Sequence, residues 1–196
     1  MAMVVATAIP LIVMGCTSVN VRMSDGTWPM AGSTTLVLPL DETAATASAS
    51  DYTFFGSIGA QGSGVAVARA LAQALEHALD TVQPDRDAVE RYILAQKMKP
   101  SELGKLDRDS AMAMARALRS DTLVTGTVRE CGSRWALFLP VARLSFEVTA
   151  FDSATGAELW HGEYRARSLR RSEWDLVREG TSAIAARLVR GRTSGR

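Results

Sequence analysis

Apolar and polar residues alternate regularly along part of the second half of the chain. From Ala142 to Ala150 every second residue is apolar, and the residues between them are Arg, Ser, Glu and Thr. A period of two places successive side chains on opposite faces of a β-strand, so one face should meet a core and the other solvent. Residues 158–167 alternate in the same way, and Asp152–Gly156 between the two runs is a turn signal. The pattern therefore predicts a β-hairpin.

Shorter apolar runs predict the other strands. Residues 34–40 (TTLVLPL) are β-branched and aliphatic, and Pro39 ends this strand or places it at a sheet edge, because proline has no amide hydrogen to donate. Residues 121–128 predict a second strand, rich in Thr and Val. The first strand of the hairpin is expected to run from Trp135 to Phe151.

In other segments apolar residues recur three and four positions apart, which is the spacing of a helix with one buried face. We expect a long helix capped by Ser63, a second at 85–96, a third at 110–118, and a last one that opens with Ser172-x-x-Asp175, which resembles a capping box. The inward residues of the second and last helices are expected to be Val89, Ile93 and Leu94, and Trp174, Val177, Thr181, Ile184 and Leu188.

In chain order these elements are β-α-α-α-β-β-β-α. This order predicts an α/β fold, with a mixed sheet of about four or five strands packed against three or four helices. A length of 196 residues suits one such domain. We expect the domain to span residues 34–190 and to be followed by a basic tail at 191–196.

The N-terminal segment, residues 1–15, is uncharged and apolar (MAMVVATAIPLIVMG). Its apolar stretch has the length of a signal-peptide core, about 7–15 residues, and is shorter than the roughly 20 that span a bilayer. It ends in Val13-Met14-Gly15-Cys16, which resembles the lipobox of bacterial lipoproteins. The resemblance implies that Cys16 receives a diacylglycerol and that signal peptidase cuts between Gly15 and Cys16.

The lipobox resemblance carries further expectations. Residues 16–33 should form a tether that joins the acylated (palmitate-bearing) Cys16 to the domain. Thr17 stands where an Asp would resemble an inner-membrane retention signal, which favours a periplasm-facing protein anchored in the outer membrane. Once Cys16 is acylated, Cys131 has no partner for an intramolecular disulfide. An ordinary secretory signal and a buried first strand are the alternatives for this segment.

The composition argues against several kinds of functional site. With 22 basic and 21 acidic residues the net charge is +1, so no overall field attracts nucleic acid, and two histidines with two cysteines are too few for the usual Cys/His zinc sites. The glycine-rich stretch 55–64 precedes a helix but lacks the Gly-Lys-Ser/Thr ending of a phosphate-binding loop. Neither His77 nor His161 stands at a diagnostic spacing from a nucleophile. We therefore expect no catalytic, cofactor-binding or metal-binding residue.

Positive charge gathers near the C-terminus. Residues 161–196 hold nine arginines and four acidic residues. Arg165, Arg167, Arg170 and Arg171 lie where the hairpin meets the last helix, and we interpret them as a contact patch for anionic headgroups, an acidic glycan or a partner. An ordinary solvated face is the alternative. The loop at 41–62 is the second candidate contact surface.

Several segments together resemble a group of periplasmic lipoproteins. They are the lipobox, the first strand, Ala117–Val128 (ALRSDTLVTGTV) and the hairpin motif Asp152–Trp160 (DSATGAELW). These segments are similar to the curli-secretion lipoprotein, the penicillin-binding-protein activator lipoprotein and the N-terminal domain of the Tol-system β-propeller protein, or to a small lipoprotein family of the same kind. The resemblance covers about residues 34–190 and implies a non-enzymatic protein that scaffolds, activates or exports.

The sequence thus favours a lipid-anchored cell-envelope lipoprotein that acts as a non-enzymatic binding, assembly or secretion-accessory module. Its expected partners are the membrane, through the lipid, and an envelope protein or peptidoglycan, and it is compatible with an oligomer. The alternatives are an envelope hydrolase without a recognisable motif and a subunit of an oligomeric secretion complex. A deep pocket joining His77 or His161 to a serine or a carboxylate would favour the hydrolase.

Overall fold

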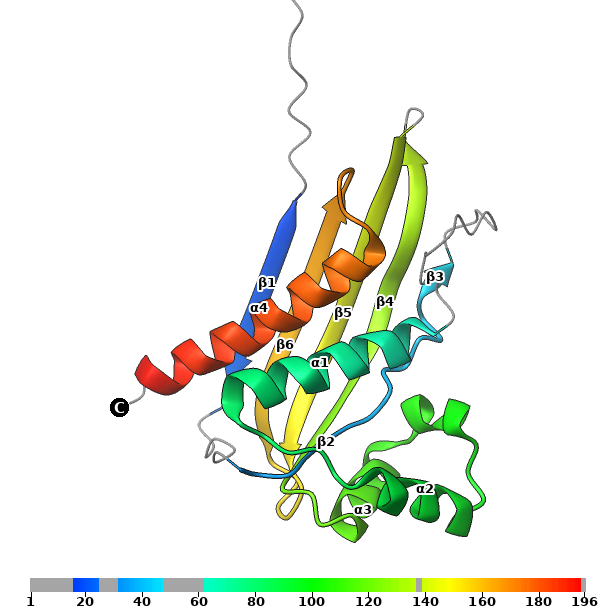
Figure 1. The fold of residues 1–196 in the computed structure, drawn as a ribbon, viewed down its shortest axis with the longest axis vertical. Helices are drawn as coiled ribbons and strands as arrows, with labels where there is room; N and C mark the ends of the chain where they lie inside the picture. The colour runs from blue at the N-terminus through cyan, green and yellow to red at the C-terminus, as the bar shows by residue number, and fades with distance from the viewer. Residues whose placement is uncertain (1–15, 25–31, 48–61, 137–138, 195–196) are drawn as a thin grey trace, which may run out of the picture.

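The computed structural model describes residues 16–24, 32–47, 62–136 and 139–194. Figure 1 shows a twisted sheet with helices α1 and α4 across one face and the shorter helices α2 and α3 gathered at one end. The strands are β1 (Thr17–Met23), β2 (Thr35–Val37), β3 (Thr46–Ala47), β4 (Thr122–Ala136), β5 (Leu139–Asp152) and β6 (Glu158–Ser168). The helices are α1 (Ser63–Leu79), α2 (Arg86–Ala95), the 3-10 helix η1 (Pro100–Lys105), α3 (Arg108–Ala117) and α4 (Glu173–Ser194). No helix within the described ranges is both long and apolar enough to cross a membrane.

The sheet is mixed. Its strand order is β1-β6-β5-β4-β2, and β3 pairs with β4 outside this path. β1, β6, β5 and β4 are antiparallel neighbours, whereas β2 and β3 run parallel to β4. The chain between β2 and β4 contains α1, α2 and α3, since parallel strands need a long crossover connection. The mixed sheet and its helices confirm the predicted fold class, and β1 and β3 are additions to the predicted order.

The main core lies between the sheet and the helix pair α1 and α4. The side chains expected to point inward from the hairpin are buried, as the alternation predicted: Ala142, Leu144, Phe146, Val148, Ala150, Trp160, Tyr164 and Ala166. The ring centroids of Phe146 and Tyr164 lie 5.5 Å apart, a separation typical of stabilising aromatic pairs. Leu71 and Leu75 of α1 are buried in the same core.

A smaller core joins α2, η1 and α3 to one end of the sheet. Leu36 of β2 and Leu123 of β4 belong to it together with Met114 of α3. The prediction that Leu94 faces inward is wrong, because this side chain is 76% exposed. α2 lies on the outside of the cluster and contributes only a narrow, partly buried stripe that includes Ile93.

Residues 17–23, predicted as part of a tether at 16–33, form the edge strand β1 instead. They pair antiparallel with β6 along their whole length. Val19 and Val21 pack against the main core, and the polar residues between them are exposed. The tether prediction was wrong here because it relied on polar composition, whereas the alternation of the two valines with polar neighbours is typical of a strand. Residues 25–31 lie outside the described residues.

The first strand of the hairpin and its neighbour also have different bounds from those predicted. β4 continues to Ala136, past the predicted end at Val128, and β5 begins at Leu139 rather than at Trp135. The turn signal at Asp152 is confirmed, since its Oδ1 accepts hydrogen bonds from the amide and the hydroxyl of Thr155.

A β-bulge in β4 explains why the predicted end at Val128 is wrong. The register with β5 shifts between Val128 and Glu130, so β4 carries one extra residue there. Arg129 and Glu130 therefore both lie on the face away from the core, and Cys131 returns to the core. The extra residue breaks the period of two, so the sequence pattern predicted that the strand ends here.

The start of α4 confirms one prediction and corrects another. The hydroxyl of Ser172 accepts from the amide of Asp175, and the amide of Ser172 donates to the Asp175 carboxylate, as in a capping box. Trp174, predicted to face inward, is 46% exposed. Glu173 is buried instead and accepts a hydrogen bond from Ser133 on β4. The other predicted inward residues are buried: Val177, Thr181, Ile184 and Leu188.

Gly180 allows α4 to approach β6 closely. A methyl group added at this position would lie 2.7 Å from Cδ1 of Tyr164, closer than side chains pack. Helix propensity alone would make Gly180→Ala stabilising by up to about 1 kcal/mol, whereas overpacking a core costs about 1–3 kcal/mol. We predict that Gly180→Ala lowers the free energy of unfolding by about 1–2 kcal/mol in urea denaturation followed by circular dichroism.

Ser182→Ala on the exposed side of α4 is the matched control and should keep or slightly raise stability, because alanine is the better helix former. If Gly180→Ala proved as stable as the wild type, the close contact with Tyr164 would be contradicted.

Candidate functional site

The face of the sheet turned away from α1 and α4 carries polar side chains. They alternate with the core residues along the same strands, and all are at least partly exposed. We call this surface the polar face. It comprises Asn20 and Arg22 of β1, His161, Glu163, Arg165 and Arg167 of β6, Arg143, Ser145, Glu147 and Thr149 of β5, and Arg129 and Glu130 of β4.

Cross-strand pairing arranges the polar face in rows. Glu163 of β6 faces Glu147 of β5 directly, and His161 faces Thr149. Facing residues of antiparallel strands have Cβ atoms about 4.5–5.5 Å apart. Two carboxylates therefore share one row, and the imidazole lies in the next.

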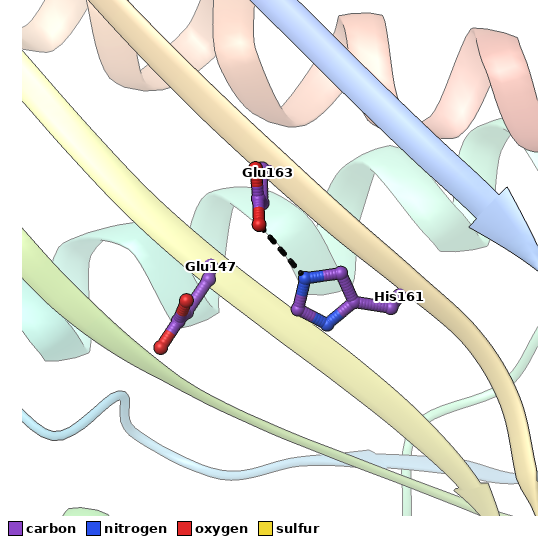
Figure 2. Close-up of side chains that lie close together, drawn as sticks. All are labelled: Glu147, His161 and Glu163. Carbon is purple, nitrogen blue, oxygen red and sulfur yellow. Dashed lines mark hydrogen bonds and ion pairs between the residues drawn. The ribbon is translucent and has the colours of Figure 1, made fainter.

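Figure 2 shows the resulting cluster of Glu147, His161 and Glu163 in front of the strands, with helices behind them. Nε2 of His161 lies 3.3 Å from Oε1 of Glu163, and Nδ1 lies 3.0 Å from Oγ1 of Thr149. One nitrogen or oxygen atom from each of the three residues lies within 4.8 Å of the other two. Arg129 binds Oε2 of Glu147 from β4, at 2.6 Å. The sheet thus brings an imidazole and two carboxylates together on an open surface.

Cys16, the predicted lipidation site, lies exposed directly before β1. Its carbonyl oxygen accepts a hydrogen bond from the amide of Arg167 at 3.1 Å, so the pairing of β1 with β6 begins at this residue. Arg165 faces Ser18 in the next row. Gly15, the predicted residue before the cleavage point, lies outside the described residues.

The four arginines predicted as one contact patch divide into two pairs. Arg165 and Arg167 are exposed on the polar face, and neither forms a salt bridge with any residue that the structure describes. Arg171 forms a salt bridge with Glu179 of α4. The amides of Arg170 and Arg171 belong to the turn that joins β6 to α4. Only the first pair lies beside Cys16 as a free positive surface.

The glycine-rich stretch was considered as a phosphate site, but a carboxylate of the chain itself caps the helix that follows it. Glu42 accepts hydrogen bonds from the amides of Gly62 and Gly64, at 3.0 and 2.9 Å. Helix α1 begins after Gly62, so Ser63 is its first residue rather than its cap. The amides that would hold a phosphate at this helix end are thus occupied. Residues 48–61, most of the predicted contact loop, lie outside the described residues.

A shallow hollow lies elsewhere, between α3 and the turn that joins β5 to β6. Nε of Arg116 donates to the carbonyl of Ser153 at 2.7 Å, and Nη2 of Arg108 donates to the carbonyl of Gly156. Both arginines that line the hollow are therefore engaged in holding the turn. Neither histidine lines it, so it does not supply the pocket that the hydrolase alternative requires.

Cys131 is enclosed in the main core, with 1% of its surface exposed. Burial, together with the nearby carboxylates of Glu173 and Glu42, raises the pKa of its thiol to about 12. The thiolate is the reactive form of cysteine, so this thiol is protonated and unreactive at neutral pH. Cys16 and Cys131 are both free.

Comparison with solved structures shows a likeness in fold. A PelC variant that forms a dodecamer, from Paraburkholderia phytofirmans, is 16% identical over 87% of this chain and 98% of that chain, with a TM-score of 0.56. A second PelC dodecamer structure from this organism is 13% identical over 88% and 97%, with a TM-score of 0.52. Lipoprotein GNA1162 from Neisseria meningitidis is 19% identical over 81% and 99%, with a TM-score of 0.55. No family model and no curated protein matches the chain.

At these identities the likeness establishes a shared fold, and a site does not follow from a fold. The presence of a lipoprotein among the neighbours agrees with the lipoprotein fold group that the sequence resembles. Membership in any of the families named from the sequence stays a prediction.

His161 was a candidate from the sequence, whereas the two carboxylates that it meets were not. The alternation already placed Glu147 on the outer face. Counting residues outward from the turn at Asp152–Gly156 would predict which residues of the two hairpin strands face each other. That count fails because the register shifts by one residue between Ala150 and Phe151. The extra residue in β6, Leu159, changes which residues of the two strands face each other, so the neighbours of His161 could not be read from the sequence.

Proposed function

We propose that this chain is a lipid-anchored, non-enzymatic module of the bacterial cell envelope, held at the outer membrane through Cys16 and facing the periplasm. The observation that carries the proposal is the position of Cys16, exposed at the start of an edge strand whose pairing begins at this residue. Acyl chains on the thiol would be attached almost directly to the sheet. The lipobox resemblance and the fold shared with a meningococcal lipoprotein support the same role.

The short attachment determines which surface meets the membrane. Arg165 and Arg167 lie beside the start of β1. Arg143 is neutralised by Glu130 at 3.2 Å, but no described acidic residue pairs with Arg165 or Arg167. A basic side chain near an anionic lipid surface contributes about 1 kcal/mol of attraction. We assign this pair to contact with anionic headgroups around the anchor.

The rest of the polar face is then available to a partner, which we expect to be an envelope protein or peptidoglycan. Confinement to a membrane raises the effective concentration of the domain toward partners in the same compartment. The open polar face supports binding rather than hydrolysis. Its His161 lies on an open surface, and the described residues around it form no pocket that could enclose a substrate.

A second candidate function is that of a subunit in an oligomeric secretion complex. The fold is shared over 87% of the chain with PelC, whose structure is a dodecamer. Among the described residues β1 pairs with β6 alone, and exposed strand edges pair readily with other chains. Light scattering of the detergent-purified chain separates the two functions, since a stable high-order oligomer is required for the second and a monomer excludes it.

Metabolic labelling with radioactive palmitate tests the anchor. We predict that the wild type incorporates label and that Cys16→Ser does not and accumulates as uncleaved precursor, because the Cys16 thiol is the acceptor. Cys131→Ala is the matched control, since it removes only the buried cysteine and should keep the label. Labelled Cys16→Ser protein would disprove lipidation at this residue.

Sedimentation with vesicles tests the assignment of the arginine pair. In the full chain carrying Cys16→Ser, we predict that Arg165→Glu with Arg167→Glu weakens binding to vesicles containing anionic lipid at least about tenfold, because two attractive charges become repulsive. Arg91→Glu with Arg187→Glu makes the same charge change at exposed positions on α2 and α4 and should have a smaller effect. Equal losses in the two double variants would show a general charge effect and contradict the assignment.

A further inference from the structure

We infer that Glu147, His161 and Glu163 form a binding site for a divalent transition-metal ion, with zinc as the reference ion. One imidazole and two carboxylates make a mixed nitrogen and oxygen ligand set of the kind that zinc accepts. The small number of histidines and cysteines argued against sites built from several of these residues, but this site needs only one histidine. The inference goes beyond the proposed function and does not depend on the lipid.

The distances suit a metal ion after small side-chain adjustments. Zinc binds imidazole nitrogen and carboxylate oxygen at about 2.0–2.2 Å, so two ligands of a tetrahedral ion lie roughly 3.4 Å apart. Nε2 of His161 and Oε1 of Glu163 are separated by 3.3 Å. The third atom, a carboxylate oxygen of Glu147, lies within 4.8 Å of the other two, so the side chains must move closer together to bind one ion.

Arg129 orients Glu147 and leaves half of its carboxylate available. Nε and Nη2 of Arg129 both donate to Oε2 of Glu147, at 3.2 and 2.6 Å. No hydrogen bond to Oε1 occurs among the residues that the structure describes. The carboxylate is therefore positioned by one oxygen and can bind a metal ion through the other.

The two neighbouring glutamates of the cluster favour a cation between them. Glu147 and Glu163 are direct cross-strand neighbours, and like charges in such a pair are destabilising. Arg129 offsets Glu147 from the β4 side, and Arg22 on β1 faces His161. Glu163 faces the uncharged Asn20 on β1, so no cationic residue lies directly opposite it. A dication between the two glutamates would remove their mutual repulsion.

The surroundings of His161 suit a metal ligand. Its Nδ1 lies 3.0 Å from the Thr149 hydroxyl oxygen, which accepts a hydrogen bond from Nδ1–H in the tautomer that leaves the Nε2 lone pair free for a metal ion. Without an ion, Nε2 and Oε1 of Glu163 form a hydrogen bond when Nε2 carries the proton, and a metal ion would take the place of that proton. Outer hydrogen bonds of this kind fix the tautomer and orientation of metal-binding histidines.

The site is open on one side. The side chain of His161 is 18% exposed, that of Glu147 26% and that of Glu163 52%. Three protein ligands leave a position for water or for a ligand from another molecule. A bound ion would therefore link β5 to β6 and offer a coordination position on the polar face.

Isothermal titration calorimetry with zinc chloride tests the site in the full chain, purified in detergent, treated with chelator and carrying Cys16→Ser so that the exposed thiol cannot bind zinc. We expect one equivalent of zinc to bind. His161→Gln should weaken the affinity at least about tenfold, and Thr149→Val, which removes only the hydroxyl beside Nδ1, should weaken it by about tenfold.

His77→Gln is the matched control, because it removes the other histidine, which is exposed on α1, and should bind zinc like the parent chain. Circular dichroism without metal checks that each variant is folded, and Glu163→Gln replaces His161→Gln if the latter is not. A parent chain that binds no zinc, or equal affinities in the parent and in a folded ligand variant, would overturn the site. Neither result depends on acylation, so the proposed function is tested separately by palmitate labelling.

Discussion

The backbone pairing between β1 and β6 is the interaction on which the arrangement of this molecule depends. It begins at Cys16, whose carbonyl accepts a hydrogen bond from Arg167, and continues through the whole of β1. No free chain is left between this cysteine and the sheet, so an anchor on its thiol would hold the domain close to the membrane. The same pairing adds Val19 and Val21 to the core and completes the polar face on its outer edge.

The two faces of the sheet differ in what covers them. One face is covered by α1 and α4, and Gly180 allows α4 to approach Tyr164 of β6 closely. The other face keeps its charged side chains in solvent and orders them by strand register. Arg165 and Arg167 lie toward Cys16, and Glu147, Glu163 and His161 lie in the following rows. The core therefore determines how the chain folds, and the polar face carries the surfaces that we propose for binding.

The fold could be predicted from the sequence wherever one face of an element is buried. The alternation around Phe146 and Tyr164 predicted the hairpin and its inward side chains, and the spacing of Leu71 and Leu75 fits the buried stripe of α1. Two β-bulges, in β4 and in β6, changed strand bounds and register in ways that no periodic pattern contains. Cys16 could be proposed because its motif is local in the sequence. The neighbours of His161 could be identified only from the strand pairing in the three-dimensional structure.

The most direct measurement is mass spectrometry of the N-terminal peptide from protein isolated from its native membrane. The account predicts a peptide that begins at Cys16 and carries a diacylglyceryl group on sulfur. A peptide that still contains Met1, or one that begins at Cys16 with a free thiol, would contradict the account of how this domain is held in the envelope.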